Sequence, residues 1–173
     1  MPWLVEYREL AGTKSAPGWA RRLVAESLTC WGLPDACEAM QLIVSELVTN
    51  SVTALEETAR HMAPQVPAVR FRLSADPGPD GAMVTVEVWD QLPSPPRPRS
   101  PVATEEGGRG LLLVGAVAKE WGWYWPDHRV GPGVEWRPAE PKLITESTAL
   151  FGKVTWATVT NGHGRGGPLP TPG

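Results

Sequence analysis

Apolar residues recur with helical spacing in three stretches of the chain, over about residues 15–32, 34–59 and 111–122. In the second and longest stretch, apolar side chains three and four positions apart form a single stripe, which predicts a helix with one buried face. The stripe comprises Met40, Ile43, Val44, Leu47, Ala54 and Leu55. Polar residues border it, and two of them, Glu46 and Asn50, interrupt an otherwise aliphatic run.

Alternating apolar and polar residues predict strands between and after these helices. Residues 69–75 and 83–90 flank a turn of sequence PGPDG, so they are expected to form an antiparallel hairpin. Further strands are expected at 3–10, at 151–159, and, as short segments, at 121–125 and 134–136. Counting the two short segments as one strand, the order is a strand, two helices, two strands, a helix and two strands. This order predicts an α+β two-layer sandwich with helices on one face of a mixed, mostly antiparallel sheet.

The length of 173 residues is typical of one domain, expected here over residues 1–160. Residues 93–101 contain too many prolines for a regular element and predict an irregular loop. Residues 161–173 are so rich in Gly and Pro that a disordered tail is expected.

Composition and charge narrow the class of protein. With 42% hydrophobic and 20% charged residues the chain has a soluble, globular composition, and no apolar run is long enough to span a membrane. A net charge of -3 and scattered Lys and Arg residues argue against direct binding of nucleic acid. Since no secretory leader is visible, we expect a cytoplasmic protein in which Cys30 and Cys37 are reduced.

Glu46 and Asn50 are the first candidate site. Four positions apart on a helix, their side chains lie about 40° apart around the axis on one face. An Asn amide oxygen is a suitable ligand for Mg²⁺, and a neighbouring carboxylate can act as a general base. Taken alone, such a pair is also typical of a solvated helix edge.

Two further segments place polar or glycine residues where a ligand could bind. Asp90 ends a predicted strand, where its carboxylate could accept a hydrogen bond from an exocyclic amine or could simply begin a turn. Residues 107–110, of sequence GGRG, directly precede the third helix. Glycines there let backbone N–H groups approach a phosphate, and Arg109 adds positive charge, although a flexible loop with a helix cap is an alternative.

Together these three segments resemble the GHKL superfamily of ATP-binding domains, and specifically the anti-sigma-factor serine/threonine kinases. The resemblance implies a Bergerat-type ATP-binding fold in which Glu46 is the catalytic base and Asn50 the Mg²⁺ ligand. It also implies that Asp90 binds the adenine amino group and that the second glycine box lies along the phosphates of ATP. The glycine-box residues are Gly108, Arg109, Gly110 and Leu111.

The sequence departs from the family pattern at three places. The glycine that usually follows two positions after the adenine-binding aspartate is replaced by Leu92, and the helix lacks basic residues in the turn after Asn50. About 25 residues, over 125–150, are inserted before the last strand. Two functions therefore stay open, a kinase that phosphorylates a serine of an antagonist protein and sequesters a sigma factor, and a catalytically weak or inactive ATP-binding interaction module.

A protein partner or a second copy of the chain is also expected. We expect the interface on the face formed by the first strand and the first helix, where aromatic residues, which are enriched at interfaces, are concentrated: Trp3, Tyr7, Trp19 and Trp31. For Trp31, filling one end of the core is at least as good an explanation. The resemblance implies a homodimer as well, and a sigma factor or its antagonist as partner.

Overall fold

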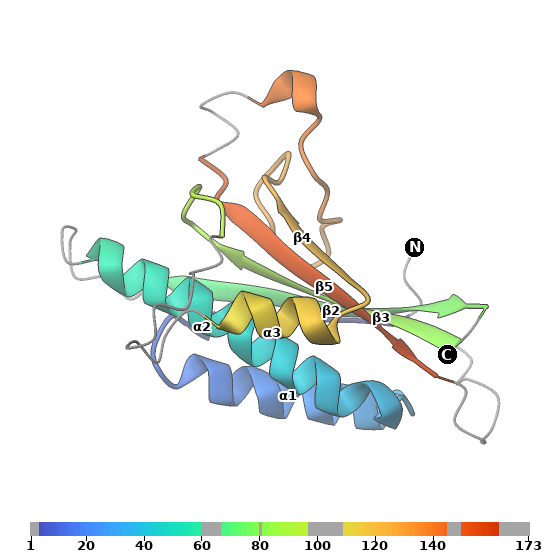
Figure 1. Cartoon of the computed structure of the whole chain (residues 1–173). Coiled ribbons are helices and arrows are strands. Elements are labelled where there is room, and N and C mark those ends of the chain that lie inside the picture. Colours follow the sequence, from blue (N-terminus) through green and yellow to red (C-terminus); the bar gives the residue numbers. More distant parts are fainter. Residues whose placement is uncertain (1–3, 60–66, 80, 97–108, 145–149, 163–173) are drawn as a thin grey trace.

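The computed structural model describes residues 4–59, 67–79, 81–96, 109–144 and 150–162. Its described strands form one five-stranded sheet in the order β1-β2-β3-β5-β4, and α1, α2 and α3 lie on one face of it (Figure 1). The strands are β1 (Leu4–Ala11), β2 (Ala68–Gly78), β3 (Gly81–Asp90), β4 (Glu120–Tyr124) and β5 (Lys153–Asn161). The helices are α1 (Ala16–Cys30), α2 (Cys37–Ala59) and α3 (Gly110–Val117), with short 3₁₀ turns at Pro34–Ala36 and Pro141–Leu143.

This architecture confirms the predicted α+β sandwich and its order of elements. The expected hairpin is present, because β2 and β3 pair in antiparallel register from Arg70 opposite Trp89 to Gly78 opposite Gly81. The expectation of a mixed sheet is wrong for the described strands, since every pair in the sheet is antiparallel.

The main core lies between the sheet and the helices. Alternate residues of β2 and β3 point toward α2, including Phe71 and Val86, and meet the aliphatic stripe of that helix. Met40, Ile43, Val44 and Leu47 of the predicted stripe are buried there. Ala54 is only half-buried and lines a cleft instead, because it lies on the edge of α2 that faces away from the sheet centre.

The third helix is shorter than its pattern predicts. It ends at Val117, and Glu120–Tyr124 form strand β4 on the edge of the sheet. Trp121 lies opposite Ala157 of β5 and packs against the main core. The short strand predicted at 121–125 is thus confirmed, and residues 120–122, which the helical pattern also included, pair with β5 instead. The strand expected at 134–136 is absent from the structure.

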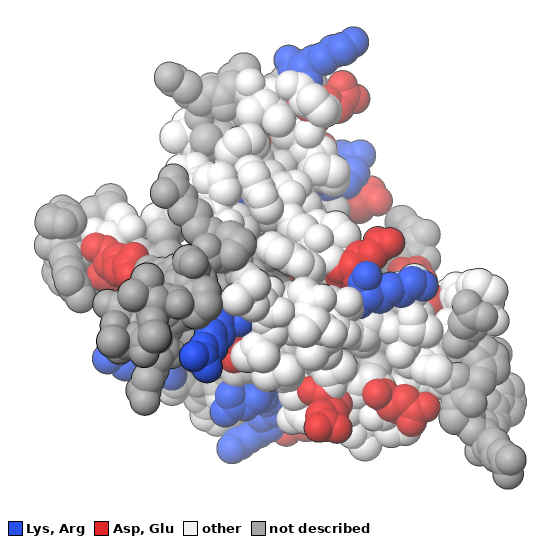
Figure 2. Space-filling model, in the orientation of Figure 1, with Lys and Arg blue, Asp and Glu red and all other residues white. Residues whose placement is uncertain are grey.

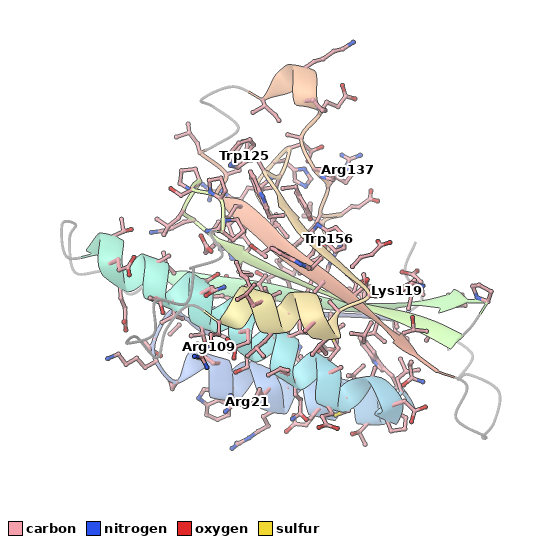
Figure 3. All side chains as sticks on the ribbon, in the orientation of Figure 1. Arg21, Arg109, Lys119, Trp125, Arg137 and Trp156 are labelled. Atoms are coloured by element: carbon pink, nitrogen blue, oxygen red, sulfur yellow. The ribbon has the colours of Figure 1, made fainter. Side chains whose placement is uncertain are left out.

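The inserted segment packs on the sheet face opposite the helices. Trp136 and Val130 form a second, smaller apolar cluster with Val154 of β5. Tyr7 contributes an edge-to-face contact with Trp136 at 6.2 Å between ring centroids, and Arg72 stacks over the Trp136 ring at 5.4 Å. Figure 3 shows Trp125 and Arg137 in the same segment. The insertion thus covers part of a sheet face that would otherwise be open to solvent.

A buried polar network lies beneath the insertion. Arg72 forms an ion pair with Glu87 on the neighbouring strand, and the Tyr124 hydroxyl donates to the same carboxylate at 2.8 Å. Burial, followed by the negative charge of Glu87, raises the pKa of Tyr124 well above its ordinary value. Tyr124 therefore remains a hydrogen-bond donor throughout the physiological pH range.

The aromatic residues of the first strand and helix do not share one face. Tyr7 points to the outer face of the sheet, Trp31 packs against the main core, and Trp19 is 51% exposed on α1. The expectation of one aromatic surface is wrong, because the strand places Tyr7 on the side of the sheet opposite α1. Trp3 lies outside the described residues, as do 97–101 of the predicted loop and 163–173 of the predicted tail.

The charged residues are distributed over the surface as the sequence predicts. On the face drawn in Figure 2, Lys, Arg, Asp and Glu are scattered without a continuous region of one sign. Of the helices that the structure describes, none combines the length and the apolar character needed to cross a bilayer.

Candidate functional site

A cleft of about 610 Å³ lies between α2, the start of α3 and the ends of β3 and β5. All but one of the site residues predicted from the sequence line it. These are Glu46, Asn50, Asp90, Arg109, Gly110 and Leu111. Gly108 lies outside the described residues. The tertiary structure therefore brings together three segments that are distant in sequence. Asn50 and Asp90 are 40 positions apart, and Asp90 and Arg109 are 19 positions apart.

Glu46 and Asn50 lie on the edge of α2 that borders the cleft, and both are half-buried. Neighbouring positions on the helix are buried in the core, so packing of the aliphatic stripe fixes the direction of the polar edge. Among the described residues, neither side chain has a hydrogen-bond or ion-pair partner. A carboxylate and an amide oxygen are thus available to a ligand on one helix face.

Gly110 is in close contact with Glu46. A Cβ atom placed on Gly110 would clash with the end of the Glu46 carboxylate, so a larger residue here would force that carboxylate to move. The predicted base and the glycine-rich segment therefore meet at one point. The Glu46 carboxylate therefore lies beside the N-terminal end of α3.

The start of α3 offers donors for an anion. The Leu113 N–H donates to the Arg109 carbonyl at 2.9 Å, and the preceding amides of the first turn have no helical partner in the part of the chain that the structure describes. The helix dipole favours negative charge at this end, and Arg109 has no ion-pair partner among the described residues. Figure 3 shows Arg109 at the start of α3 beside α2. A phosphate group fits this end of the cleft.

Asp90 occupies the other end of the cleft and is 1% exposed. Its Oδ1 atom accepts hydrogen bonds from the Leu92 N–H at 3.0 Å and from Lys153 Nζ at 2.7 Å. Its Oδ2 atom accepts from Ser51 Oγ at 2.7 Å and from Lys153 Nζ at 2.8 Å. The carboxylate is therefore bound by protein groups on both oxygens.

Ser51 and Lys153 were missed by sequence reasoning. Ser51 follows Asn50 on α2 and reads as an ordinary helix residue, although it is buried. Lys153 lies directly opposite Asp90 in the register of β3 and β5, a pairing that joins residues 63 positions apart. A lysine on the inward-facing side of a strand, in a row with Thr155 and Ala157, was the signal that could have revealed it.

The site can now be compared with known proteins. A protein-family model described as the histidine kinase-like ATPase domain matches residues 12–127, which include both helices of the cleft and Asp90. The chain belongs to this family. No curated protein matched the chain significantly. Membership of the histidine kinase-like ATPases supports the GHKL resemblance and implies that the chain binds ATP.

The two ends of the cleft differ in how well they suit the nucleotide of a histidine kinase-like ATPase. The phosphate end fits, since Gly110 leaves space, the first amides of α3 have no partner among the described residues and Arg109 is positively charged. Asn50 supplies an oxygen of the kind that Mg²⁺ prefers, and no cluster of three or more His, Cys, Asp or Glu residues competes for a metal in the described part of the chain. The end of the cleft at which adenine is expected to bind differs, because protein groups already bind both oxygens of the Asp90 carboxylate.

Proposed function

We propose that this protein is an ATP-dependent regulatory kinase that phosphorylates a serine or threonine of a partner protein, in the manner of the anti-sigma-factor kinases. The observation that carries the proposal is the contact between Glu46 and Gly110. At this contact a carboxylate that has no partner among the described residues lies beside the N-terminal end of α3, which suits a phosphate group. Kinase chemistry requires a base and a phosphate site within one cleft.

Each residue has a role in this proposal. When bound, Mg-ATP supplies the phosphoryl group and the metal neutralises part of its charge. Asn50 holds the metal through its amide oxygen, and the α3 amides with Arg109 bind phosphate oxygens. Glu46 would accept the proton of the partner's hydroxyl group as that oxygen bonds to the γ-phosphorus, while the bond from that phosphorus to ADP breaks and ADP leaves.

A protein partner is part of the proposal. Leu112, Leu113 and Val117 are exposed on the outer side of α3, and Leu113 also lines the cleft. Apolar side chains beside the phosphate site would contact a protein substrate that presents its hydroxyl group to Glu46. A sigma factor and its antagonist are the partners that we propose from the resemblance.

The second candidate is a nucleotide-binding module that regulates its partner by binding alone. The observation in its favour is that protein groups already bind the Asp90 carboxylate, which lowers the affinity of the cleft for the adenine base. A cytoplasmic location suits either function and is part of the proposal.

Labelled ATP separates the two candidates. Purified protein is incubated with Mg²⁺, γ-labelled ATP and a candidate antagonist protein, while calorimetry measures Mg-ATP binding. The kinase transfers label to the partner, and transfer requires Mg²⁺. Binding of Mg-ATP without transfer to any partner supports the second candidate, and absence of nucleotide binding contradicts both.

A further inference from the structure

We infer that Lys153 blocks access of the adenine amino group to Asp90, so that this chain binds nucleotides through their phosphates with little discrimination at position 6 of the purine. The inference rests on the nucleotide binding of the proposed function. It assigns to Lys153 a specificity-determining role in that same cleft.

The first argument is the hydrogen-bonding capacity of Asp90. A carboxylate offers about four lone-pair sites. Leu92 N–H and Ser51 Oγ each occupy one, at 3.0 and 2.7 Å, and Lys153 Nζ contacts both oxygens. No site is left for an adenine N–H while Lys153 remains in place.

The second argument is that Lys153 is itself held. Its side chain is 6% exposed, and its ammonium has three donors. Two point to the Asp90 oxygens, and Nζ also lies 3.4 Å from the Leu92 carbonyl oxygen. Moving the ammonium aside would leave two opposite charges separated in a buried site, which is strongly unfavourable.

The third argument is that the backbone before Lys153 is fixed against β3. Gly152 adopts φ +78°, and a Cβ there would clash with the Asp90 carbonyl oxygen. Trp89 Nε1 donates to the Phe151 carbonyl oxygen at 2.6 Å. The turn that begins β5 therefore delivers the lysine to Asp90, and the pair forms part of the folded sheet.

The inference predicts an unusual specificity for the unmodified protein. A hydrogen bond from the adenine amino group to a free carboxylate is worth about 10- to 100-fold in affinity. Mg-ATP and the Mg²⁺ complex of purine riboside triphosphate, which lacks the amino group, are titrated into the wild-type chain by calorimetry. Equal affinities are expected.

The variant Lys153→Met supplies the complementary test. Loss of the ammonium frees the Asp90 carboxylate, so Mg-ATP should bind about tenfold or more tightly than to wild type, and ATP should now be preferred over purine riboside triphosphate. Lys119→Met, which removes an exposed lysine at the end of α3, is the matched control and should change neither affinity. Far-UV circular dichroism checks that both variants are folded.

The outcomes separate this inference from the proposed function. Wild-type preference for ATP of tenfold or more overturns the inference and leaves the proposed function standing. The wild-type comparison needs no substitution, so it decides even if Lys153→Met fails to fold. A folded Lys153→Met that gains no affinity for ATP also overturns the inference. If neither protein binds either triphosphate, nucleotide binding fails and the inference fails with it.

Discussion

At the scale of single residues, Glu46 is the side chain on which the proposed chemistry depends. Replacing it by alanine should leave the affinity for Mg-ATP nearly unchanged, because the residue has no role in holding the phosphates. Transfer of phosphate to a partner serine should fall by about 10²–10⁴-fold, the contribution of a general base. Calorimetry and label transfer measure the two quantities.

Glu56 offers the control for this experiment, since it is exposed on the same helix and does not line the cleft. Glu56→Ala should transfer phosphate at the wild-type rate. A Glu46→Ala protein that retained full transfer would show that another group removes the proton.

Gly110 is the second residue with a testable role. A methyl group at this position would displace the Glu46 carboxylate. Since a shift of about 1 Å in a catalytic group can cost about 10²-fold in rate, Gly110→Ala should lower transfer by roughly that factor. Gly131→Ala is the matched control, because a Cβ there meets no atom within 4 Å. Equal rates for the two variants would argue against the contact as a catalytic arrangement.

At the scale of elements, the inserted segment acts as a second layer on the outer face of the sheet. Trp136 is its largest buried side chain, and Trp136→Ala should lower the free energy of unfolding by about 3–5 kcal/mol. Urea denaturation measures this change. Nucleotide affinity should be unaffected, because Trp136 and the cleft lie on opposite faces of the sheet.

Val134 gives the comparison within the same segment. It is 40% exposed, so Val134→Ala should change stability by no more than about 0.5 kcal/mol. A Trp136→Ala variant as stable as Val134→Ala would mean that the insertion contributes little to the fold.

At the scale of the whole molecule, we propose that two chains associate through the outer face of α1. Trp19 is 51% exposed there, and the Arg22 guanidinium lies over its ring at 4.9 Å from the centroid. Light scattering at high micromolar concentration should give twice the monomer mass of 18.7 kDa. Trp19→Ser should return the mass to that of the monomer.

Leu150→Ser controls for loss of any exposed apolar side chain, since Leu150 is 82% exposed in the turn before β5. It should leave the dimer intact. A wild-type mass of 18.7 kDa would rule out the homodimer and leave a different protein as the only partner for this face.

Local sequence determined the parts of this protein that depend on short-range pattern. The hairpin of β2 and β3 follows from alternation around a turn, and α2 follows from its aliphatic stripe. The same stripe oriented Glu46 and Asn50, because side chains four positions apart share a helix face whatever the helix packs against. The placement of Arg109 and Gly110 at the start of α3 was also predictable from local sequence.

Tertiary structure alone decided what depends on pairing between distant segments. The sequence predicted a short strand at 121–125 but also a helix through residue 122, and pairing with β5 decided that residues 120–122 belong to the strand. The position of the inserted segment on the outer face of the sheet was likewise decided by packing between distant segments. The partner of Asp90 was decided in the same way. Lys153 contacts Asp90 only because β3 and β5 pair, although the two residues are 63 positions apart in sequence. In our inference, this contact determines whether the Asp90 carboxylate can accept a hydrogen bond from a ligand.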